Sequence, residues 1–242
     1  MSIAKKFEVI ADEVYEKGKK DEYDKFWDIF QNYGKRTSFD YAFRGNCFNF
    51  NNFYPKYDIK PVGDMRKMFY AWEIDSVHMG SLKQRLEECG VTLNTSQATY
   101  FENAFSWGKW TELPVIDMSN ETQGCNSCFA RCSKLHTIEK IIVSENTLIA
   151  DTMFTNDTAL ENLTIEGVIA KNNFNVKDCK KLSGASIVSI IEALSDTTNG
   201  LTVTLSQTAV DNMAFPIVGN KGTYNSWTDL EQSRTNWTIS LV

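Results

Sequence analysis

Three segments of the chain share one spacing of apolar residues. Each has an apolar residue, then a Cys or Asp three positions later, and then a Leu after three more. The segments begin at Phe129, Phe154 and Val176, at offsets of 25 and 22 residues. A repeat of this length is typical of a solenoid, in which each unit forms one coil and buries its apolar edge only against neighbouring coils. The pattern therefore predicts a stack of coils, an architecture that serves as a scaffold for binding.

Each predicted coil also contains a short run rich in β-branched residues, at 113–117, 138–143 and 163–168. Such runs suit strands stacked about 4.8 Å apart, so we expect a narrow parallel sheet with one strand per coil. A further unit at 105–116 aligns with the unit at Phe129 after deletion of one residue. The repeat positions that should point into the core are Phe129, Cys132, Leu135, Phe154, Leu160, Cys179 and Leu182.

The two ends of the chain depart from this repeat. In residues 1–35, an apolar stripe with spacings of four, three and four predicts a helix. The stripe can dock on the adjoining coils or pair with the same helix in a homo-oligomer, and the sequence leaves both roles open. Residues 36–183 form the predicted solenoid, with irregular first coils and an inserted helix at 81–89. Residues 184–242 predict a C-terminal α/β cap with helices and two alternating strands. The stripe residues are Ile3, Phe7, Ile10 and Val14.

Composition and charge limit the classes of binding partner that we expect. The 242 residues are 42% hydrophobic and carry a net charge of −6, so a nucleic-acid ligand would lack a favourable long-range field, and we expect none. The first residues lack the apolar core of a signal peptide, and no segment approaches the length of a membrane span. We therefore expect no secretion signal and no membrane insertion.

Candidate chemistry is sparse. A zinc-like spacing occurs at Cys125, Cys128, Cys132 and His136. The repeat already explains Cys132, so we expect no metal and no cofactor. The sequence alone leaves open whether these four residues bind a metal. The chain has two histidines and no recognisable nucleophile motif, which favours a protein that is not an enzyme. A carboxylate-based glycan hydrolase is kept as a minor alternative.

Four aromatic residues of the early coils are the candidate binding residues. They cannot all occupy the single inward Phe position of their coils, so some can lie exposed as anchors for a protein or glycan. They can equally fill the irregular core of the first coils, and the pattern does not separate these roles. The four residues are Tyr70, Trp72, Trp107 and Trp110.

The apolar-x-x-Cys-x-x-Leu step resembles the BspA-like branch of the leucine-rich repeats, most closely over residues 105–183, with Asp157 replacing one Cys. This resemblance implies a right-handed solenoid. The whole chain also resembles leucine-rich repeat proteins encoded in phages and prophages of Gram-positive gut bacteria. That likeness rests on Tyr23-Asp-Lys-Phe-Trp-Asp28, Pro55-Lys-Tyr-Asp-Ile-Lys-Pro61 and Asn236-Trp-Thr-Ile-Ser-Leu241.

The phage resemblance implies a tail-associated virion protein, made in the bacterial cytoplasm, that takes part in structure or host recognition. Its expected partners are other virion or tail proteins, or a host cell-surface protein or glycan. The alternative is a bacterial leucine-rich repeat module for interaction or adhesion. The missing signal peptide favours the virion, because an adhesin requires export whereas a virion protein leaves the cell by lysis.

Overall fold

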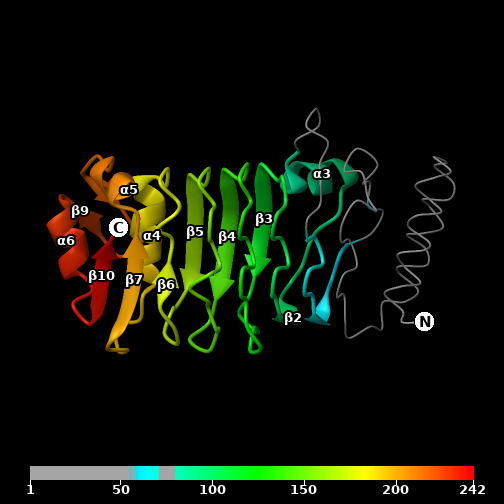
Figure 1. Ribbon diagram of the computed structural model, residues 1–242, viewed down its shortest axis with the longest axis horizontal. Helices are drawn as coiled ribbons and strands as arrows, with labels where there is room; N and C mark the ends of the chain where they lie inside the picture. The colour runs from blue at the N-terminus through cyan, green and yellow to red at the C-terminus, as the bar shows by residue number, and fades with distance from the viewer. Residues whose placement is uncertain (1–54, 56–57, 71–79) are drawn as a thin grey trace, which may run out of the picture.

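The computed structural model describes residue 55 and residues 58–70 and 80–242. Within these ranges, short strands follow one another along the long axis of the molecule, and most of the helices gather at the C-terminal end (Figure 1). The elements before the cap are β1 (Val62–Asp64), α3 (Leu82–Cys89), β2 (Gln97–Tyr100), β3 (Glu112–Asp117), β4 (Thr137–Val143), β5 (Asn162–Gly167) and β6 (Phe174–Asn175). Those of the cap are α4 (Gly184–Ala193), β7 (Leu201–Leu205), α5 (Gln207–Asp211), β8 (Ile217–Val218), β9 (Thr223–Tyr224), α6 (Trp227–Gln232) and β10 (Trp237–Leu241).

The central sheet is parallel and has the order β3-β4-β5. The three strands predicted from the β-branched runs are confirmed, each beginning one residue earlier than expected. In register, Leu113 lies opposite Ile138, which lies opposite Leu163, and all three side chains are buried. The apolar residues therefore form rows that run from coil to coil on the inner face of the sheet.

A stack of phenylalanine rings occupies the core behind this sheet. The rings of Phe69, Phe105, Phe129 and Phe154 lie nearly parallel, with centroids 5.2, 5.5 and 5.4 Å apart. Phe174 meets the last of them edge-on at 5.9 Å. All seven repeat positions expected to point inward are buried. One ring per coil, at a nearly constant spacing, fixes the distance at which coils pack.

The turns that carry these rings are joined by backbone hydrogen bonds. The amides of the first three rings donate to carbonyls of the next coil, from Phe69 to Ala104 at 2.7 Å, from Phe105 to Cys128 at 2.9 Å and from Phe129 to Met153 at 3.0 Å. Two residues after the ring, the backbone is left-handed in three successive coils, at Trp107, Arg131 and Asn156 (φ 64°, 65° and 63°). Because the same backbone conformation recurs, these three side chains leave the stack from equivalent places.

Helix α4 ends the central sheet by taking the place of a further strand. At the outer edge of β5, the amides of Leu163 and Ile165 donate hydrogen bonds to the hydroxyls of Ser186 and Ser189, at 2.9 and 2.8 Å respectively. A strand edge without partners would expose backbone donors to other chains, and these two serines satisfy them within the molecule. A second parallel sheet, with the order β10-β7-β6, takes one strand from before α4 and two from after it.

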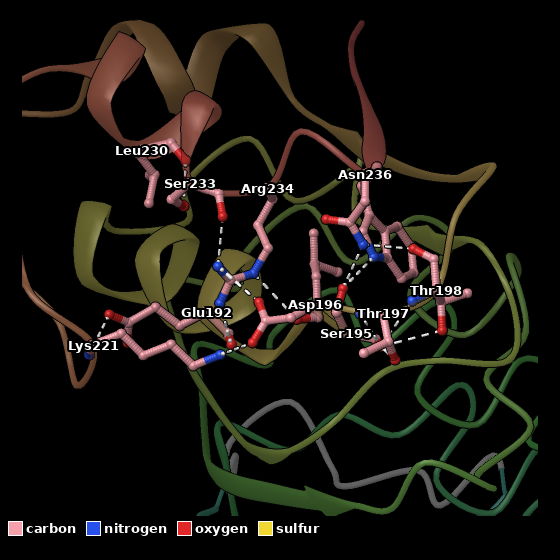
Figure 2. A network of polar contacts seen from close by, with 12 residues as sticks. Glu192, Ser195, Asp196, Thr197, Thr198, Lys221, Leu230, Ser233, Arg234 and Asn236 are labelled. Carbon is pink, nitrogen blue, oxygen red and sulfur yellow. Dashed lines mark hydrogen bonds and ion pairs between the residues drawn. The ribbon is translucent and has the colours of Figure 1, made fainter.

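A buried polar network holds the cap together (Figure 2). The Arg234 guanidinium donates to the carbonyls of Glu192 and Leu194 at 3.1 and 3.2 Å, and its side chain is only 6% exposed. The Glu192 carboxylate accepts from the amides of Asn220 and Lys221, at 2.7 Å each, and from the hydroxyl of Tyr224 at 3.1 Å. The antiparallel pair β8–β9, which the sequence pattern did not predict, therefore contacts α4 through this carboxylate.

Several predictions fall outside the described residues. The stripe of Ile3, Phe7, Ile10 and Val14 and the side chain of Trp72 lie there, so docking or self-association of the N-terminal segment stays a prediction. In the part of the chain that the structure describes, no helix is both long and apolar enough to cross a membrane.

Candidate functional site

The structure describes three of the four aromatic residues proposed for binding, and their exposure differs. Trp107 is 47% exposed on its turn, Tyr70 is half-buried, and Trp110 has no exposed surface. The Trp110 ring meets Phe69 edge-on, with centroids 6.0 Å apart. Trp110 therefore belongs to the core and is taken out of the proposed binding set. The physical reason is the one-residue deletion in its coil, which places Trp110 where neighbouring coils have Leu135 and Leu160.

The turn from Phe105 to Trp110 has little freedom to rearrange. The Trp107 amide donates to the Ala130 carbonyl at 2.9 Å, and the buried Ser106 hydroxyl donates to the same oxygen at 3.0 Å. A Cβ atom at Gly108 would lie 2.2 Å from the Trp110 ring, so this position admits only glycine. The turn thus directs one indole into the core and the other toward solvent, without a flexible hinge between them.

Arg131 supports the exposed indole. Its guanidinium carbon lies 4.4 Å from the centroid of the Trp107 ring, from the equivalent position of the next coil. A guanidinium over an indole face is attracted by the ring quadrupole and limits the rotamers of both side chains. Trp107 and Arg131 are also the residue types most enriched among the dominant contacts of binding interfaces. The sequence reasoning missed Arg131, although its offset of 24 residues from Trp107 matches the repeat.

A second pair of this kind lies toward the first coils. Arg66 lies over the Tyr100 ring at 4.7 Å and forms an ion pair with Asp64 at 2.7 Å. The Tyr100 hydroxyl donates to the Glu102 carboxylate at 2.8 Å, and this bond raises the pKa of Tyr100. Here the Arg66 guanidinium and the Glu102 carboxylate both have partners within the protein. The pair therefore offers less unsatisfied charge to a ligand than Trp107 and Arg131 do.

The cysteines with zinc-like spacing serve the core. Cys125, Cys128 and Cys132 are fully buried, and burial raises the pKa of Cys125 to about 12. The Cys132 thiol donates to the Phe105 carbonyl at 3.1 Å, whereas His136 is exposed. Within the described ranges, no cluster of three or more His, Cys, Asp or Glu side chains could hold a metal ion. The expectation of a metal-free protein stays a prediction.

The two buried acidic residues of the coils bind backbone amides. Asp157 accepts from the Cys132 amide at 2.8 Å, and Glu121 accepts from the amides of Gly124 and Leu148. Burial raises the pKa of both carboxyl groups. Each carboxyl group links one coil to the next, so its contacts are those of a structural residue.

No protein-family model matches the chain, and neither a curated protein nor a solved structure matches it.

Proposed function

We propose that this protein is a non-enzymatic binding protein of the leucine-rich repeat class, associated with a phage tail, in which a rigid right-handed solenoid presents the exposed pair of Trp107 and Arg131 to a partner. The partner is another virion protein or a protein or glycan of the host surface. The observation that carries the proposal is the exposure of Trp107 on a turn that the core holds fixed.

The energetic reason is preorganisation. Binding costs free energy when flexible side chains must be ordered, about 0.5–1.5 kcal/mol for each mobile side chain. Trp107 avoids much of this cost because Arg131 and the turn already limit its motion. An indole held exposed in this way keeps apolar surface in contact with water, at a free-energy cost that is removed when a partner covers it.

The first test compares partner binding with folding stability. Trp107→Ala should weaken binding to purified virions, or to the host envelope fraction, by tenfold or more, a loss of about 1.4 kcal/mol or greater. The melting temperature should change little, because the indole is half exposed. Val218→Ala is a matched control, since Val218 is 77% exposed but lies in the cap. Equal binding by both variants would contradict the role of Trp107.

The second test concerns the assignment to the virion. Mass spectrometry of purified particles should detect this protein in constant proportion to the tail proteins. Its absence from intact particles, together with its presence in cell envelopes without prophage induction, would instead support a bacterial interaction module.

A further inference from the structure

Two rows of backbone hydrogen bonds align the exposed segment between each Phe turn and the strand that follows. In the first row, the Arg131 amide donates to Thr155 at 2.8 Å. In the second, the His136 amide donates to Thr111 at 2.9 Å, that of Glu161 to His136 at 2.9 Å, and that of Ser183 to Glu161 at 2.8 Å. Residues between the rows therefore occupy equivalent positions, coil after coil.

Basic side chains gather at these rows and between them, and Lys177 lies one position before the first row. Together with Trp107 they form what we call the basic strip, and all of its members are exposed. Lys109 belongs to the coil of β3, Arg131 and Lys134 to the coil of β4, and the remaining lysines to the coil before α4. The members of the basic strip are Trp107, Lys109, Arg131, Lys134, Lys177, Lys180 and Lys181.

Most of these charges have no internal counter-charge. Among the described residues, Lys181 forms the one ion pair of the strip, with Glu161 at 3.7 Å. Asp178, which accepts from the Asn156 amide at 2.8 Å, adds a second formal negative charge beside the strip, against the six positive charges of the lysines and Arg131. A positive strip on a chain with a net charge of −6 is a local reversal of sign. The strip is therefore complementary to an anionic partner.

The coil of β5 lies between the two basic groups. Asn156, Thr158 and Asn162 are exposed there and offer hydrogen-bonding groups, and the partly exposed Glu161 of the same coil pairs with Lys181. Along the strip, the cationic coils of β3 and β4 are followed by the coil of β5 and then by the cationic coil before α4, at the strand spacing of about 4.8 Å. A row of charges along stacked coils suits a linear polymer that carries repeated charges.

We infer that the basic strip binds an acidic glycan, a linear polysaccharide or polyol whose repeat carries a carboxylate or a phosphate, with Trp107 packing against a sugar or polyol face at one end. This inference depends on the proposed binding function and names the partner class. A protein partner is less suited, because protein interfaces have an apolar centre and the strip offers a single exposed aromatic residue. A nucleic acid is disfavoured by the negative net charge of the chain.

The test measures binding of the full-length protein to polygalacturonate, to poly(glycerol phosphate), to neutral dextran and to oligo(dT), by calorimetry at increasing salt. Binding to either of the first two, and its loss at high salt, is expected. Binding to polygalacturonate alone identifies the carboxylate as the recognised group, and binding to poly(glycerol phosphate) alone identifies the phosphate. Binding to neither, equal binding to dextran, or binding to oligo(dT) alone overturns the inference.

A pair of charge-reversal variants locates the site. Lys134→Glu with Lys180→Glu should weaken glycan binding at least about tenfold, because two attractions become repulsions. Lys171→Glu with Lys221→Glu changes the net charge equally but lies outside the strip, and it should retain the affinity. Equal losses of glycan affinity in both double variants would show that binding depends on net charge, and would overturn the assignment of the site to the basic strip. If Trp107→Ala abolishes virion or envelope binding while none of the acidic glycans binds, the proposed function stands and this inference alone fails.

Discussion

The central coils and the C-terminal cap both bury apolar residues, but the cap adds a buried polar network. The coils bury stacked phenylalanines, so that each coil repeats the contacts of the one before. The cap buries Arg234 and Glu192, whose hydrogen bonds occur once. A repeated apolar contact sets the distance between coils but does not determine at which coil the stack ends. A single polar network can do so, because its partners exist in one place only.

Removing one ring from the stack is the largest expected disruption. Phe129→Ala leaves a cavity between Phe105 and Phe154 and should lower the free energy of unfolding by about 3–5 kcal/mol. Urea denaturation followed by circular dichroism measures this loss. Leu148→Ala is the control, since that side chain is 37% exposed, and it should cost much less. Equal costs would mean that the ring stack does not dominate the stability of the coils.

The cap should respond to loss of donors more than to loss of charge. Arg234→Met keeps an apolar stem of similar length but leaves the carbonyls of Glu192 and Leu194 without their donor, at a cost of about 1–3 kcal/mol. Asp196→Asn removes only the charge of the ion-pair partner, whose side chain is 68% exposed, and should cost below about 1 kcal/mol. Chemical denaturation of both variants checks the order. The reverse order would assign the stability of the cap to the ion pair.

This difference in chemistry also explains what the sequence could predict. The strands and the buried repeat positions follow from a pattern that recurs, so Phe129, Phe154 and their equivalents could be placed without coordinates. The pairing of Arg234 with distant carbonyls occurs once and leaves no periodic signal. Trp107 and Trp110 were predictable in part: the pattern limited how many aromatic side chains could point into the core, but it did not identify which of them would. The Gly108 contact and the one-residue deletion decided it.

Asp157 is an ionisable residue buried in the coils, as Glu192 and Arg234 are in the cap. It occupies the place of Cys132 and Cys179 in their own coils and is equally buried. Its Oδ1 accepts from the Cys132 amide, whereas its Oδ2 has no hydrogen-bond partner among the described residues. Burial raises the pKa of this carboxyl well above its usual range, and the negative charge of Asp178 adds to the effect. Folding therefore shifts this carboxyl group toward its protonated form.

Replacing Asp157 tests the same comparison through the pH dependence of stability. A group whose pKa is raised on folding contributes its stability fully below its unfolded pKa, about 3.9, and loses it as pH rises through the folded value. Asp157→Asn keeps an acceptor for the Cys132 amide but does not titrate. The stability of the wild type relative to this variant, measured by urea titrations between pH 4 and pH 8, should therefore fall as pH rises above about 4 until the pH passes the folded pKa. Glu121, whose pKa burial also raises, is present in both proteins and cancels in the difference. A difference that stays constant over this range would mean that Asp157 remains charged in the fold, and that the coils tolerate a buried charge as the cap does.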